Sequence, residues 1–261
     1  MSPTAWLLLK VALVAGVVVL ASQASRRFGH AAGGLLAGLP MIAGPITGLL
    51  LTEVPAERVR SVCAATLVCQ PALIAYLLTY AHSVRRLAWP ACLLLSLAVF
   101  AALGSGLLWL GLPPVASVAL AVVAPLLGGR LMPARSAASS AVTLPRSELA
   151  ARVVVAMAVA AGVLWGAQHL SAGVAGLLLA APITGIVLPS FTLPRHGAPA
   201  TVALLAGFVR GQAGFVAFFV VMLLALPALP GALAWGLAMA TAALVPWALA
   251  RGWQRRIKAA A

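Results

Sequence analysis

Long apolar runs alternate with short polar clusters along the whole chain. A helix that crosses a bilayer needs about 20 consecutive, mostly apolar residues. By this criterion the pattern predicts nine membrane spans: 4–22, 30–52, 59–81, 87–110, 115–132, 151–168, 170–190, 199–226 and 231–250. The fifth run contains Pro125 and ends near Arg130, which leaves open whether it crosses fully.

The composition supports this interpretation, because too few charged residues are present to cover a soluble domain. The chain has 261 residues, of which 64% are hydrophobic and 8% are charged, whereas a soluble domain has about 25% charged residues. Its acids are Glu53, Glu57 and Glu148, and all three lie outside the predicted spans. We therefore expect an all-α polytopic membrane protein.

The basic residues predict its orientation. The formal net charge is +14, and most of the cations cluster after spans 1, 3, 5, 7 and 9, on one side of a nine-span protein. They are Arg26, Arg27, Arg85, Arg86, Arg130, Arg135, Arg146, Arg152, Arg195, Arg251, Arg255, Arg256 and Lys258. Basic loops stay in the cytoplasm, so we expect the N-terminus outside and the C-terminus inside. Charge placed between spans also argues against nucleic-acid binding.

A short motif occurs twice inside predicted spans. Residues 43–48 read AGPITG in span 2, and residues 180–185 read AAPITG in span 7. Three further pairs follow in the same order, at offsets of 142 to 146 residues. They are AGVVV from 15 and AGVLW from 161, QPALIAY from 70 and QAGFVAF from 212, and LAW from 87 and from 233. Four matches in order predict an internal duplication.

Counting the crossings gives the repeat its topology. Each half has four spans and span 5 lies between them, so the second half enters the membrane from the opposite side. The expected organisation is a first four-helix repeat over 1–112, a linker helix and cytoplasmic loop over 113–150, and an inverted repeat over 151–261. Such 4+1+4 inverted-topology repeats, here with broken helices 2 and 7, are typical of secondary transporters that work by alternating access.

One half also resembles a known family. Residues 33–40 read GGLLAGLP, an acidic-then-basic loop follows from Glu53 to Arg60, and Pro71 lies in span 3. These features resemble the GlpM-like small bacterial inner-membrane proteins, over about residues 5–110 and more faintly in the second half. The resemblance implies a bacterial inner-membrane protein and no particular activity.

The repeated motif supplies the first candidate site residues. Pro45 and Pro182 lack an N–H and should kink or break their helices. Broken helices near the middle of a membrane often form substrate sites, and Thr47 and Thr184 would supply hydroxyl groups there. The alternative is a simple kink, in which Gly44 and Gly48 allow close helix packing. Gly48 and its counterpart Gly185 are the remaining candidates from the motif.

Four further polar residues lie within predicted spans. Arg210 is about twelve residues into span 8, roughly 18 Å deep at 1.5 Å per residue, where a charge normally faces a cavity or a partner. The alternative is that it snorkels to the surface, which is easier for Lys10 near the outer end of span 1. Gln70 and Gln212 are equivalent in the repeat and could bind a ligand or join helices.

Residue types that are missing from the predicted spans limit the functions that the sequence supports. No predicted span contains an acid for a cation site, and the sequence has no zinc motif or phosphate-binding loop. We expect no catalytic centre, metal or cofactor. The expected function is transport or facilitated passage of an anionic substrate, or one with an anionic head such as a lipid-linked phosphate. The alternatives are a non-transporting membrane scaffold and a lipid-modifying enzyme. Membrane lipid is the expected partner, and a homo-oligomer stays open.

Overall fold

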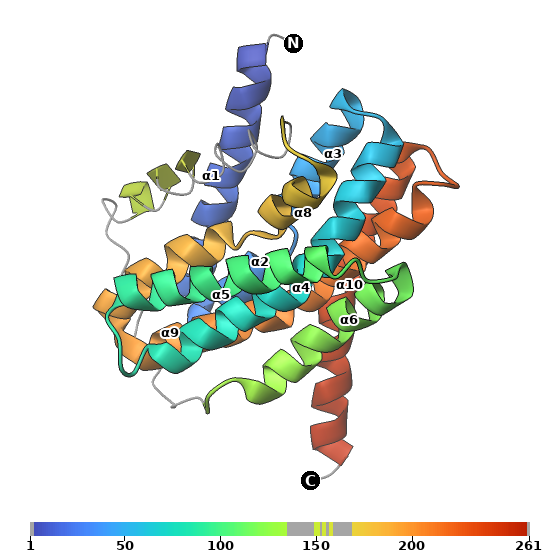
Figure 1. Cartoon of the computed structure of the whole chain (residues 1–261). Helices are drawn as coiled ribbons and strands as arrows, with labels where there is room; N and C mark the ends of the chain where they lie inside the picture. Colours follow the sequence, from blue (N-terminus) through green and yellow to red (C-terminus); the bar gives the residue numbers. More distant parts are fainter. Residues whose placement is uncertain (1–2, 135–148, 152, 155–156, 159–168, 260–261) are drawn as a thin grey trace.

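The computed structural model describes residues 3–134, 149–151, 153–154, 157–158 and 169–259. Over these residues the chain is helical, with no strand (Figure 1). The helices are α1 Pro3–Phe28, α2 His30–Gly38, α3 Ala43–Glu53, α4 Ala56–Ser83, α5 Trp89–Trp109, α6 Pro114–Leu131, α8 Ala172–Ala180, α9 Ile183–Ala225 and α10 Gly231–Ala259. Most of predicted span 6 (151–168) lies outside the described residues.

Several of these helices fit a multi-pass membrane protein. Five stretches are long and apolar enough to cross a bilayer: His30–Glu53, Ala56–Ser83, Trp89–Trp109, Pro114–Leu131 and Ala172–Ala225. Large apolar side chains face outward on α5 and α6, where Leu94 is 67% and Val115 is 83% exposed. Apolar faces this exposed suit lipid rather than water. The count of nine spans stays a prediction.

The predicted spans and the helices agree in most places. Spans 3, 4 and 5 correspond to α4, α5 and α6, and prolines at or just before their first turns favour these starting points. Span 2 is divided into α2 and α3 by residues 39–42. The expected separation of spans 7 and 8 is present, because α9 consists of two helices that meet at Gly197, where the backbone is not helical. That glycine has φ +75°, a value that favours glycine over other residues.

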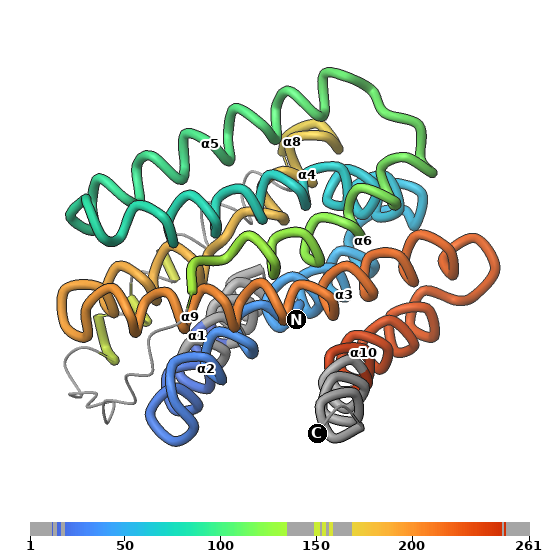
Figure 2. The backbone as a smooth tube through the Cα atoms, turned by 90° about the horizontal axis from the view of Figure 1, so that it is seen from below, coloured from blue at the N-terminus to red at the C-terminus, as the bar shows by residue number. Residues whose placement is uncertain are grey.

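Two helices form the centre of the protein. Figure 2 shows α9 lying between α4 on one side and α2 and α10 on the other, while α5 covers the outer side of α4. The largest fully buried side chains come from these central helices and include Tyr76 and Tyr80 of α4 and Phe218 and Phe219 of α9. α4 and α9 therefore hold the core, and the helices around them meet the surroundings.

Two contacts join ends of helices that are far apart in the sequence. Near the start of α4, Nη2 of Arg58 donates to the carbonyl oxygen of Leu170 at 2.8 Å. At the other ends, the rings of His30 and His196 lie 4.9 Å apart. Both pairs join ends that the nine-span prediction puts on the same side.

Four glycines bring α2 against the part of α9 that follows the kink. Gly34 and Gly38 of α2 face Gly207 and Gly211 of α9. A Cβ at any of the four would clash with a backbone carbonyl oxygen of the opposite helix. This pair of GxxxG sequences allows the two backbones to touch, as small residues do where membrane helices cross. It fixes the end of α2 beside the middle of α9.

Candidate functional site

Both copies of the repeated motif lie at a break between two helices. α2 ends at Gly38 and α3 begins at Ala43, whereas α8 ends at Ala180 and α9 begins at Ile183. The expected breaks are present: the first, over residues 39–42, precedes Pro45, and the second, over residues 181–182, ends at Pro182. Pro45 is in the first turn of α3 and Pro182 is the N-cap of α9, so neither interrupts a helix interior. A proline costs little there, since first-turn N–H groups have no helical partner.

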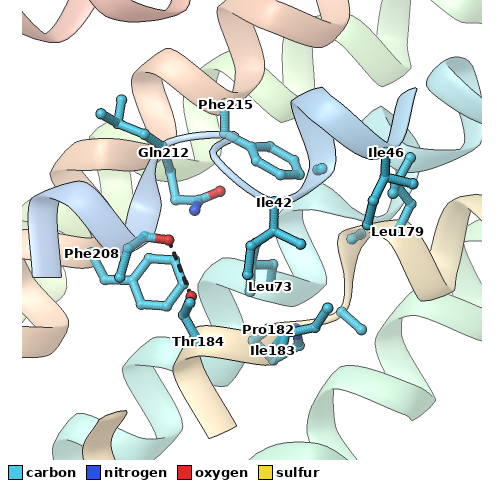
Figure 3. Close-up of a pocket in the computed structure, with 15 residues that line it drawn as sticks. Ile42, Ile46, Leu73, Leu179, Pro182, Ile183, Thr184, Phe208, Gln212 and Phe215 are labelled. Atoms are coloured by element: carbon cyan, nitrogen blue, oxygen red, sulfur yellow. Dashed lines mark hydrogen bonds between the residues drawn. The ribbon is translucent and has the colours of Figure 1, made fainter. Parts of the chain in front are cut away.

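The two breaks line one cavity (Figure 3). Its volume is about 40 Å³, which exceeds the roughly 10–15 Å³ needed to hold a water molecule. Ile42 and Ile46 come from the first break, Leu179 and Ile183 from the second, and the walls are mostly apolar. The cavity thus lies between the two copies of the motif.

Polar side chains of the second half cap the end of α2 at this cavity. Thr184 Oγ1 donates to the carbonyl oxygen of Ala37 at 3.2 Å, the dashed line in Figure 3. Gln212 Nε2 donates to the carbonyl oxygen of Gly38 at 3.0 Å. The last carbonyls of a helix have no partner within it, so these two bonds satisfy acceptors that the break leaves open.

A second glutamine lies behind the first. Gln70 of α4 is fully buried, and its Nε2 donates to Oε1 of Gln212 at 3.5 Å. This distance is at the long limit for a hydrogen bond. Oε1 of Gln70 has no hydrogen-bond partner in the described structure. The two glutamines that are equivalent in the sequence repeat therefore meet, and one acceptor of the pair stays open.

Two helix N-termini also face the cavity. The N-cap residues are Ile42 for α3 and Pro182 for α9; both line the cavity, and neither helix has a side-chain cap. A helix N-terminus carries about half a positive charge. Two helix N-termini therefore lie at the cavity, where no cationic side chain lines it, and some of their N–H groups already have partners: Gly44 donates to the carbonyl oxygen of Pro40 and Ile183 to that of Ala181.

The structure brings together only part of the predicted site. Thr184, Pro182 and Gln212 line the cavity, and Gln70 contacts Gln212. Gly185 is buried next to them, where its carbonyl oxygen accepts from the hydroxyl of Tyr76 at 2.9 Å.

The equivalent residues of the first half lie elsewhere. Pro45 does not line the cavity, and Thr47 bonds to the carbonyl oxygen of Ala43 in its own helix at 2.7 Å. Gly48 packs against the indole of Trp235. The expectation of two equivalent threonines in the cavity is wrong for Thr47. The side chain of Lys10 lies outside the described part of the structure.

Arg210, the other deep polar residue expected at the site, lies away from this cavity. Its side chain is exposed and does not line the cavity. Residues two apart on a helix point about 200° apart, at 3.6 residues per turn. Because Gln212 points into the cavity, Arg210 must point away from it. The depth in the membrane was predicted from the sequence, but not the face of the helix.

Two aromatic donors at the breaks were missed. Tyr76 bonds to Gly185, and Nε1 of Trp235 donates to the carbonyl oxygen of Gly44 at 2.8 Å. A buried tyrosine hydroxyl or tryptophan N–H usually finds a hydrogen-bond partner. The sequence therefore indicated that these side chains would form hydrogen bonds, but not with which residues. The GxxxG sequences at 34–38 and 207–211 were a specific signal of a close helix contact.

Comparison with known proteins found no matching family model, no similar curated protein and no similar solved structure. The resemblance to GlpM-like proteins therefore stays a prediction.

Proposed function

We propose that this protein is an inverted-repeat membrane transporter or facilitator, and that its substrate binds between the two helix breaks. The observation that carries the proposal is one cavity lined by both copies of the repeated motif, with Ile42, Ala43 and Ile46 from the first and residues 179–184 from the second. Broken helices that meet at one site are the arrangement by which many transporters bind their substrates.

Reciprocal packing supports the inverted repeat. α2 of the first half packs on the second part of α9, and α8 of the second half packs on α4. These two contacts pair equivalent elements across the halves. Gln70 and Gln212, which are equivalent in the sequence, lie in contact with each other. Such a pair is expected close to an axis that relates two repeats.

The two uncapped helix N-termini favour a substrate with an anionic or electron-rich group, because backbone N–H groups and helix dipoles attract negative charge. Arg210 does not take part in this recognition, since it lies outside the cavity. A cavity of about 40 Å³ suits a small solute better than a lipid-linked phosphate. We place the protein in a bacterial inner membrane, with the N-terminus outside and the C-terminus in the cytoplasm.

Cysteine accessibility tests this proposal without knowledge of the substrate. The native Cys63, Cys69 and Cys92 are free thiols and would first be replaced by alanine. Ile42→Cys or Ile183→Cys would then be treated with a membrane-impermeant thiol reagent from each side of oriented vesicles. We expect labelling of both positions, because a transporter opens its site to water.

Leu77→Cys is the matched control, since Leu77 is fully buried in α4 and does not line the cavity. It should stay unlabelled from either side. If the two cavity positions were as unreactive as this control, the transporter proposal would be refuted.

A non-transporting scaffold is the second candidate. The observation that favours it is tight packing: the cavity is small, and the glycine contact holds α2 directly against α9. A scaffold predicts the same protection of Ile42→Cys, Ile183→Cys and Leu77→Cys, so the labelling experiment separates the two functions.

A further inference from the structure

We infer that the hydrogen bonds at the end of α2 hold this conformation, and that the opposite conformation replaces them by equivalent bonds at the end of α8. This inference rests on the proposed transport function and assigns a switch to the same site. It starts from a difference between the two halves, at positions where their sequences are alike.

The difference lies in what the equivalent side chains do. Thr184 and Gln212 of the second half donate across the cavity to the end of α2. Their equivalents in the first half do not cross it. Thr47 donates within α3 to Ala43, and Gln70 only reaches Gln212 at 3.5 Å. The same residue types are thus engaged in one half and disengaged in the other.

The end of α8 offers the acceptors for the exchange. Leu179 and Ala180 are the last two residues of α8, as Ala37 and Gly38 are of α2, and both line the cavity. In the described structure no side chain donates to the carbonyl oxygens of Leu179 or Ala180. These two carbonyls hold the same place at the end of α8 as the capped pair at the end of α2, whereas the alignment of the two motifs pairs Ala37 and Gly38 with Val174 and Ala175.

An inverted-repeat transporter can change access by letting its two halves exchange conformations. Applied here, Thr47 and Gln70 would donate to the carbonyl oxygens of Leu179 and Ala180 while α2 is released. The number of capping bonds is the same before and after the exchange. Neither conformation then has a large advantage, as a transporter needs if both are to be populated.

The hydrogen bonding of Gln70 suits a residue that changes its partner in the proposed exchange. It is fully buried, yet one of its oxygens has no partner and its single bond is long. A buried amide is costly to leave half satisfied. Gln212, in contrast, has a 3.0 Å bond that sets the orientation of its amide. The less fully bonded glutamine belongs to the half that is disengaged.

Opposite effects of equivalent substitutions test the exchange. The reporter is the two-sided labelling of Ile42→Cys, compared as the ratio of rates from the two sides. Thr184→Val removes a bond that crosses the cavity in the observed conformation. Thr47→Val removes the crossing bond of the opposite conformation, together with the bond to Ala43 within its own helix in the observed one. We expect the ratio to shift about tenfold in opposite directions, because one net hydrogen bond is equivalent to about that factor.

Gln212→Leu and Gln70→Leu form a second pair with the same expected directions. Thr192→Val is the control, because Thr192 is buried in α9 and bonds to its own helix at 2.7 Å; it should leave the ratio unchanged. Threonine-to-valine variants keep side-chain shape, so they remain informative if a leucine variant does not fold.

The outcomes separate the two proposals. Shifts in the same direction, or no shift, with Ile42→Cys still labelled, would overturn the exchange and leave the transport function standing. No labelling from either side in any variant would overturn both.

Discussion

The close contact of α2 with α9 makes a quantitative prediction for Gly34→Ala. The added Cβ would overlap the carbonyl oxygen of Leu204, and it would lie 2.8 Å from the carbonyl carbon of that residue and 3.0 Å from the nitrogen of Phe208. All of these are backbone atoms of a helix and cannot rotate away. Overpacking of this kind costs about 1–3 kcal/mol, whereas alanine gains about 0.5–1 kcal/mol over glycine inside a helix. We expect a net loss of about 1–2 kcal/mol in the free energy of unfolding.

The measurement is denaturant unfolding of the purified protein in detergent micelles, followed by tryptophan fluorescence. Gly106→Ala is the control, because Gly106 also lies within a helix, α5, but no heavy atom lies within 4 Å of its missing Cβ. We expect this variant to be as stable as the wild type or slightly more stable. Equal stabilities of Gly34→Ala and Gly106→Ala would contradict the direct contact of the two backbones.

Three further substitutions test single contacts. Tyr76→Phe leaves the buried carbonyl oxygen of Gly185 without its donor and should lower the free energy of unfolding by about 1–3 kcal/mol; an unchanged stability would contradict the bond. Arg210→Ala should leave the labelling ratio of Ile42→Cys unchanged, because Arg210 is exposed away from the cavity. A shifted ratio would show that Arg210 does act at the site. Arg58→Ala removes the bond to Leu170 near the protein surface and should cost at most about 1 kcal/mol in the same unfolding experiment; a larger loss would show that this contact holds the helix ends together.

Much of the helical architecture could be predicted from the sequence, because crossing a bilayer imposes a length and a composition. α4, α5 and α6 appear close to where the apolar runs place them. The breaks were also predictable, since proline cannot continue a helix without loss. Their exact positions were not, because a proline in a first turn is as acceptable as one that ends a helix, and only packing decides between them. The break at Gly197 falls in the expected loop between spans 7 and 8, although the helices extend closer to it than hydropathy indicated.

Residues of the candidate site were predictable from the sequence where their depth within an apolar run was sufficient to identify them. Gln212 and Thr184 are polar residues deep in apolar runs, and both line the cavity. Arg210 satisfied the same criterion and yet points away, because hydropathy does not give the face of a helix. Thr47 shows a different limit. Sequence symmetry predicts equal roles for Thr47 and Thr184, but only Thr184 reaches across the cavity in this structure.

The glycine contact and the kink together restrict how the proposed exchange can take place. Gly34 and Gly38 hold α2 against the part of α9 that contains Gln212, so these two segments should move as one body. Thr184 lies on the other side of the kink at Gly197 and is not held by that contact. Release of α2 therefore requires Gln212 to turn away by side-chain rotation, whereas Thr184 can leave Ala37 when the first part of α9 pivots at the glycine. The kink is thus the one place in α9 where the proposed motion needs a change of the backbone.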